Sequence, residues 1–350
     1  MTRRYWIAGL LGQAGCTQPP QPPPLARAAG YLWHAQAEDG GWHSHTYGLL
    51  RSGQSLTPFV LEALLQVPEA IYPEPHAKVE RAVAFIRSNT QSDGSVGMSD
   101  PSIPDYPNYG TALSVSALCR ARRPVQHMVE YLRQQQFTER NGWSQKDPAY
   151  GAWGMGGNRR TPPNTGHVDL SMTRYVIEAL RAAGVPASDP MFACARVFIE
   201  RCQNLDSDGG FFFTTTEFDT NKAGHDGKRF RSYGTTTADG ILALLATGLP
   251  PGHERVLAAR RWLTSHHRDM NVPGFVGEAY QRWPRGLAFY YAAASAQAFR
   301  ALTGGSVIGE LERTQRADGS WSNPENLVKE DDPFIATPFA IRALTGAERL

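Results

Sequence analysis

The chain has 350 residues, of which 41% are hydrophobic and 19% are charged, and its formal net charge is +2. A chain of this length can bury a large core, and one domain of repeats can use all of it. The nearly balanced charge lacks the basic surplus of proteins that bind nucleic acid through their surface, so we expect no nucleic-acid partner.

The first sixteen residues have the pattern of an export signal. The charged pair Arg3-Arg4 is followed by a short apolar run from Tyr5 to Leu11, and small residues precede Cys16. This order resembles a bacterial lipoprotein signal in which Cys16 is acylated, and the Pro-rich stretch 17–24 would then tether a globular domain off the membrane. We expect a protein that is exported and lipid-anchored, facing the periplasm or the cell exterior. If the segment is not a signal, the protein is cytoplasmic.

A short sequence frame recurs six times along the rest of the chain. In each copy, Thr or Ser is followed six and seven residues later by Ala-Leu, and the first and last copies are nearly the same, TPFVLEAL and TPFAIRAL. The six hydroxyl residues are Thr57, Thr111, Thr173, Thr237, Ser295 and Thr337. Repeats of this size indicate stacked supersecondary units. We expect each hydroxyl to cap an inner helix, with Pro58 and Pro338 at the first helical position.

Each inner helix is preceded by an amphipathic outer helix. The expected outer helices cover residues 25–36, 76–91, 125–136, 189–203, 253–266 and 306–315. A Gly-rich turn joins each pair and is clearest in Gln36–Trp42 and Gln315–Trp321, with weaker copies that include Gln136 to Trp143. The Gln can bond the loop backbone, and the Trp ring can cover it. The sequence therefore predicts an all-α fold, an α6/α6 toroid of six helix pairs in a single domain over residues 25–350. The long segments 144–166 and 219–231 are expected to form its rim.

The Gln-x-x-x-Gly-x-Trp loops with paired helices resemble the prenyltransferase/squalene-oxidase repeat family. That family includes squalene and hopene cyclases and the β subunits of protein prenyltransferases, and the resemblance covers nearly the whole chain after the N-terminal segment. It implies an apolar central cavity suited to isoprenoid chains. The repeat is specific for the architecture and only weakly specific for the reaction, because function belongs to sites rather than to folds.

The catalytic motifs of that family are incomplete in this sequence. Its cyclases carry an Asp-x-Asp-Asp proton donor that runs into the Thr of an inner helix, whereas Asp169-Leu170-Ser171-Met172 keeps only the first Asp before Thr173. Its prenyltransferases hold zinc with an Asp-x-Cys pair, and Ser171 again stands where the thiolate should be. We therefore expect no metal and no cofactor, and whether the chain is an enzyme stays open.

Several polar and aromatic residues are expected to meet at one mouth of the ring, because they lie just before or near the start of inner helices. Asp169 and Asp239 are the candidate acids, although Asp169 can equally serve as a helix cap. The candidate ligand-binding residues are His167, Tyr109, Tyr233, Tyr291, Trp153 and Asp331.

Three functions are compatible with these patterns. The first is a terpenoid cyclase- or transferase-like toroid that binds an apolar, isoprenoid small molecule in its central cavity. The second is a non-catalytic scaffold or binding module anchored to a membrane, and the third is a carbohydrate-active enzyme, since helical toroids also carry paired carboxylates. A deep apolar cavity would favour the first, a filled ring the second and an open acidic trench the third.

Overall fold

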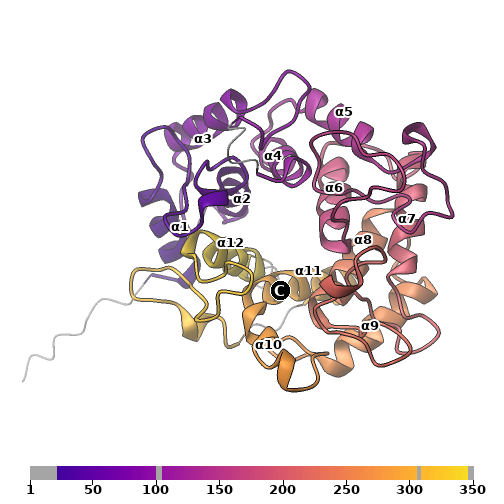
Figure 1. The fold of residues 1–350 in the computed structure, drawn as a ribbon. Coiled ribbons are helices and arrows are strands. Elements are labelled where there is room, and N and C mark those ends of the chain that lie inside the picture. Colours follow the sequence, from indigo (N-terminus) through magenta and orange to yellow (C-terminus); the bar gives the residue numbers. More distant parts are fainter. Residues whose placement is uncertain (1–21, 100–104, 306–308, 346–350) are drawn as a thin grey trace, which may run out of the picture.

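The computed structural model describes residues 22–99, 105–305 and 309–345, and in these ranges the chain is helical and has no β-sheet. Six helices form an inner layer. They are α2 (Leu56–Leu64), α4 (Pro107–Arg120), α6 (Leu170–Ala182), α8 (Gly234–Ala246), α11 (Ala288–Thr303) and α12 (Pro333–Leu344). Each packs against the next in this order, and α12 packs back onto α2, so the inner layer closes into a ring (Figure 1). The predicted all-α toroid is therefore observed.

The outer layer contains five α-helices in the described ranges. They are α1 (Pro24–His34), α3 (His76–Ser88), α5 (Gln126–Gln135), α7 (Pro190–Arg201) and α9 (Glu254–His266). The sixth outer helix, predicted over 306–315, differs: the part of it that is described contains only a 3-10 turn at Glu312–Thr314. This last repeat is the shortest in the sequence, and Gly304 ends α11 in a left-handed conformation only a few residues earlier. The short α10 (Trp283–Gly286) lies on the rim before α11.

The hydroxyl of the repeated frame has a different role from the one we predicted. It lies within the first two turns of the inner helix and accepts a hydrogen bond from a backbone N–H of the preceding loop. The pairs are Trp42 to Thr57 at 3.0 Å, Val96 to Thr111 at 2.9 Å, Trp153 to Thr173 at 3.4 Å, Phe211 to Thr237 at 3.1 Å and Trp321 to Thr337 at 3.0 Å. The frame therefore fastens each loop to its inner helix. Ser295 is the exception and donates to the Tyr291 carbonyl within its own helix.

The loop glutamines join neighbouring repeats. Gln36, Gln136, Gln203 and Gln315 each donate to a carbonyl of their own loop and to a carbonyl in or beside the next outer helix. For Gln315 the second acceptor is Pro24 in α1, so this bond joins the two ends of the ring. In the third loop the tryptophan equivalent to Trp42 is Trp153 and not Trp143, because additional residues separate Gln136 from its Gly-Ala-Trp. Like the Trp42 indole, the Trp153 indole donates to a carbonyl of the preceding outer helix.

We expect Thr337→Val to lower the free energy of unfolding by about 1–3 kcal/mol, because the buried N–H of Trp321 would lose its acceptor. Ser295→Ala is the matched control, since this hydroxyl holds no loop and bonds within its own helix. Urea unfolding followed by circular dichroism measures both variants. Equal losses would show that the loop bond has no special contribution.

The export segment, including Cys16, lies outside the described residues, so export and lipid attachment stay predictions. Among the described helices, none combines the length and the apolar character needed to cross a membrane.

Candidate active site

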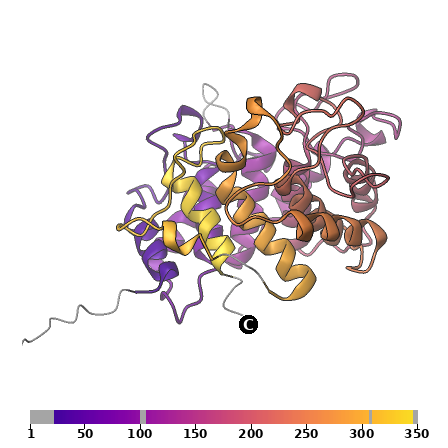
Figure 2. The same ribbon diagram turned by 90° about the horizontal axis from the view of Figure 1, so that it is seen from below.

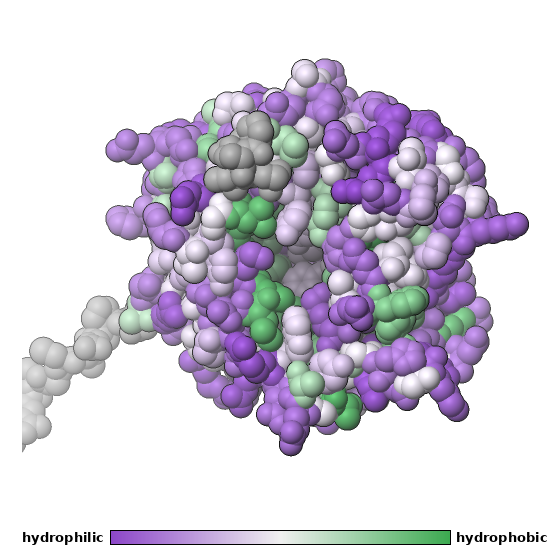
Figure 3. Space-filling model, viewed as in Figure 1, coloured by the Kyte–Doolittle hydropathy of each residue, from purple (hydrophilic) through white to green (hydrophobic). Residues whose placement is uncertain are grey.

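The ring encloses two adjoining chambers on the face where the inner helices begin. They have volumes of about 260 Å³ and 210 Å³. The loops gather on this face, and the space-filling view shows a hollow at its centre with hydrophobic side chains at the edge (Figures 2 and 3). The wall of the first chamber is mostly apolar, and its residues include Phe59, Leu113, Met172 and Phe339 from four inner helices. Tyr109, Ser171, Phe213, Val328 and Phe339 line both chambers.

Asp105 is a carboxylic acid in the wall of the first chamber, directly before α4, and its exposed fraction is 1%. Its Oδ2 accepts a hydrogen bond of 2.9 Å from the Ser55 backbone N–H. Its Oδ1 is buried and has no hydrogen-bond partner among the described residues. Burial raises the pKa of Asp105 to about 6, although the Ser55 hydrogen bonds and the charge of Lys329 act in the opposite direction. A carboxyl group in this state is partly protonated near neutral pH.

Asp105 was not predicted from the sequence, although it lies six residues before Thr111, the same spacing at which Asp331 was chosen before Thr337. In this repeat α4 begins at Pro107, four residues before Thr111, and Asp105 lies two residues further upstream. The sequence did contain a signal that could have identified Asp105. It is an acid two residues before Pro107, a proline that can begin a helix.

Asp169 is the N-cap of α6, as one of its two predicted roles required. Its Oδ1 accepts a hydrogen bond of 2.7 Å from the Met172 N–H, and the His167 Nε2 lies 2.9 Å from its Oδ2. The side chain also borders the first chamber. A functional role for Asp169 beyond capping stays a prediction.

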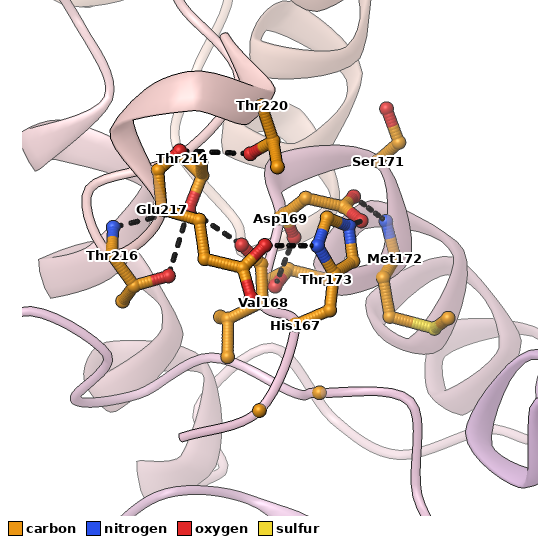
Figure 4. Close-up of polar contacts among 12 residues, drawn as sticks. His167, Val168, Asp169, Ser171, Met172, Thr173, Thr214, Thr216, Glu217 and Thr220 are labelled. Atoms are coloured by element: carbon orange, nitrogen blue, oxygen red, sulfur yellow. Dashed lines mark hydrogen bonds and ion pairs between the residues drawn. The ribbon is translucent and has the colours of Figure 1, made fainter. Parts of the chain in front are cut away.

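His167 connects Asp169 to the rim. Its Nδ1 lies 2.5 Å from a carboxylate oxygen of Glu217, on the long segment between Phe213 and Arg231, and Figure 4 shows the imidazole between the two carboxylates. These partners raise the pKa of His167, with the hydrogen bond to Asp169 as the largest cause, while partial burial opposes the shift. Only the protonated ring can donate to both carboxylates at once.

We expect this connection to make stability depend on pH. The pKa of His167 in the folded state is raised above its ordinary value of 6.5. The contribution of His167 to the free energy of unfolding is therefore fully present below pH 6.5 and is lost as the pH rises through the folded-state pKa. The stability difference between the wild type and His167→Gln should therefore shrink from pH 5.5 to pH 8.5. Urea unfolding across this range tests it, and a constant difference would contradict it.

Asp239, the other candidate acid, is fully buried beneath the chambers, where it forms an ion pair with Arg174. Its Oδ1 accepts a hydrogen bond of 2.8 Å from Arg174, and its Oδ2 accepts bonds of 2.6 Å from Ser171 and 2.7 Å from Tyr290. Ser171 and Tyr290 line the second chamber, whereas Asp239 itself does not. Burial raises the pKa of Asp239, and the charge of Arg174 opposes the shift.

The remaining predicted residues separate into two groups. Tyr109 lines both chambers and Tyr233 lines the second, and their role in ligand binding stays a prediction. Tyr291, Trp153 and Asp331 line neither chamber. The Tyr291 hydroxyl contacts His267 at 2.8 Å, the Trp153 indole donates to the Leu132 carbonyl at 2.7 Å, and Asp331 accepts from the Tyr47 hydroxyl at 2.5 Å. Each of these three side chains therefore bonds a residue of another helix or loop rather than facing a chamber.

No protein-family model matches the sequence, and no curated protein matches it either. Solved structures do match. The type II terpene cyclase MstE from Scytonema, in a complex with geranylgeranyl dihydroxybenzoate (substrate), aligns with a TM-score of 0.57 and 12% identity over 93% of this chain and 97% of that one. The chain has a terpenoid cyclase-like α/α toroid fold. A protein from Actinoplanes aligns with a TM-score of 0.58 and 16% identity, over 93% of this chain and 98% of that one.

The same toroid also carries other chemistry. A D-mannose isomerase aligns with a TM-score of 0.55 and 13% identity over 91% of this chain and 96% of that one. At these identities the likeness establishes the fold alone, so the reaction has to be argued from the chambers and their acids.

Proposed function

We propose that this protein is a terpenoid cyclase, which binds an isoprenoid chain in the two chambers and protonates one of its alkenes with Asp105. The observation that carries the proposal is the buried Oδ1 of Asp105, which lies in the wall of an apolar cavity and has no hydrogen-bond partner in the part of the chain that the structure describes. The fold likeness to MstE supports it, since structures of that enzyme include a complex with merosterolic acid A (product).

The chambers suit an apolar chain. Small-molecule sites have volumes of about 300–1,000 Å³, and the two adjoining chambers together reach that range. Leucine, methionine and phenylalanine dominate the first chamber, which gives a sugar few hydrogen-bond partners. This composition disfavours the carbohydrate-active alternative, and the presence of the chambers disfavours a filled scaffold ring.

Asp105 is better placed as a proton donor than the other buried acids around the cavity. Asp169 and Asp239 use both oxygens in hydrogen bonds. Glu330 lines the second chamber, and burial raises its pKa to about 7, but both of its oxygens accept bonds from Phe289 and Tyr290 at the start of α11. Only Asp105 has an oxygen without a described partner, and that oxygen can direct a proton at an alkene.

The reaction follows from this placement. The proton leaves the Asp105 carboxyl for one alkene carbon, and the other carbon becomes a cation that the next alkene of the chain attacks. The aromatic residues Phe59, Tyr109 and Phe339 line the chamber and can stabilise the positive charge. Loss of a proton from the final cation yields a cyclic isomer of the substrate, and Asp105 regains its proton from solvent.

The test is to incubate the protein with geranylgeraniol and to search by gas chromatography–mass spectrometry for cyclic products of unchanged mass. We expect wild-type protein to bind this alcohol and form such products. Leu113→Trp should weaken binding by about tenfold or more, because the indole would fill the first chamber. Ala84→Trp, on the exposed side of α3, is the matched control and should bind normally. Equal binding by both variants would contradict the chamber as the site.

A further inference from the structure

A third cavity adjoins the second chamber at the rim. It is a groove of about 890 Å³ between the segment Phe213–Arg231 and the region of Trp283. Aromatic side chains form much of its wall, including Phe218, Phe230 and Tyr280. The groove shares Phe213 and Lys222 with the second chamber, so these two side chains stand where the groove and the chamber meet.

Lys222 is the positively charged residue at this junction. Its Nζ lies 3.2 Å from the centroid of the Phe213 ring, and it forms no ion pair or hydrogen bond with another residue in the described ranges. Burial lowers the pKa of Lys222 to about 8, although the charges of Asp169 and Asp239 act in the opposite direction. A partly buried ammonium without a partner is unfavourable, so this position is suited to an anion brought by a ligand.

The backbone around Lys222 is fixed in place. The Asn221 side chain accepts hydrogen bonds of 2.9 Å and 3.1 Å from the N–H groups of Phe213 and Thr214, and it donates to the Thr214 carbonyl at 3.1 Å. Lys222 therefore sits on a braced loop next to the aromatic ring that it contacts. Such pre-organisation lowers the entropy cost of holding a bound anion.

We propose that Lys222 binds the carboxylate head group of the ligand whose apolar chain occupies the two chambers. This inference rests on the proposed function and specifies its substrate class as an isoprenoid acid. Lys222 lines the second chamber and Asp105 the first, so a ligand held by its head at Lys222 places its distal alkenes toward the acid.

The surrounding charges favour a single negative charge over a diphosphate. Among the described residues that line the groove, Lys222 is the one lysine or arginine, and Asp219 adds a negative charge. His167 is already held between Asp169 and Glu217. One ammonium balances one carboxylate, whereas a diphosphate would leave charge uncompensated beside Asp219.

The experiment uses isothermal titration calorimetry at pH 7 to compare an acid with the alcohol that has the same hydrocarbon chain. The probes are geranylgeranoic acid, geranylgeraniol, decanoic acid and decanol, with geranylgeranyl diphosphate as a further arm. We expect the wild type to bind each acid about tenfold more tightly than its alcohol. Lys222→Met should remove this preference by weakening the binding of the acids, and Lys222→Arg should keep it. Lys228→Met, an exposed cation on the same loop, is the matched control and should behave as the wild type.

A pH series gives a second readout. Because the ammonium form binds the carboxylate, wild-type affinity for the acids should fall as the pH rises above about 8. The alcohols, and all probes with Lys222→Met, should show no such dependence.

The outcomes separate the two proposals. Three results would each overturn the head-group inference alone. They are an acid preference that persists in Lys222→Met, an acid preference that is lost instead in Lys329→Met, and binding of the diphosphate that is tighter than that of every other probe. Lys222-dependent binding of decanoic acid without binding of either isoprenoid would support the anion site and overturn the proposed isoprenoid substrate. Binding of no probe by the wild type would overturn both.

Discussion

Asp105→Asn is expected to lower the rate of product formation by about 10²–10⁴-fold, because the amide cannot supply the proton that starts cyclisation. Ligand affinity should stay within about twofold of the wild type, since Asn has nearly the same shape and the chamber keeps its apolar wall. The measurements are turnover by gas chromatography–mass spectrometry and binding of geranylgeraniol by calorimetry. Asp206→Asn, at an exposed position on a distant loop, is the matched control and should keep full turnover.

The pH dependence of turnover gives an independent check. Because the protonated carboxyl is the active form and burial raises its pKa to about 6, the rate should be highest below that value and fall as the pH rises through it. Asp105→Glu should restore part of the turnover, while full turnover in Asp105→Asn would place the acid elsewhere. Asp169→Asn and Glu330→Gln would then be the variants to compare.

The ring could be predicted from sequence because its signals are local. The repeated hydroxyl, the Gly-rich turn and the loop Gln each recur within one helix pair, so their spacing reveals the architecture without any knowledge of contacts between pairs. Even so, the hydroxyl was assigned to a cap, because sequence shows that a helix begins nearby but not that the loop N–H of Trp42 lies against Thr57.

The candidate site was harder to predict because its chemistry depends on contacts between repeats. Asp105 is an ordinary acid in the sequence. Its burial against the previous repeat raises its pKa, although the hydrogen bonds from Ser55 of that repeat act in the opposite direction. Asp239 was noticed as an acid within an inner helix, but its partner Arg174 comes from the neighbouring inner helix. Sequence spacing places residues on helices, whereas the environment of each acid follows from how the helices pack.

A large loss of stability is also expected when the ion pair between Arg174 and Asp239 beneath the chambers is broken. Asp239→Leu should lower the free energy of unfolding by about 3 kcal/mol, at the lower end of the range for a broken buried pair. The loss arises because Arg174 has only 4% of its side chain exposed and would lose its contact with Asp239. The cost stays at the lower end because Arg174 keeps its contact with Glu178 at 3.0 Å. Urea unfolding followed by circular dichroism measures it.

The double variant Arg174→Met with Asp239→Leu distinguishes a charge effect from a packing effect. If the uncompensated Arg174 charge causes the loss, removing that charge as well should recover most of the lost stability, because apolar side chains of similar volume can replace a buried ion pair. Ser171 and Tyr290 lose their shared acceptor in both variants, so their contribution cancels in the comparison. A double variant no more stable than Asp239→Leu would mean that these two hydroxyl bonds, or the shape of the site, hold α6, α8 and α11 together. In that case the ion pair would contribute little beyond its hydrogen bonds.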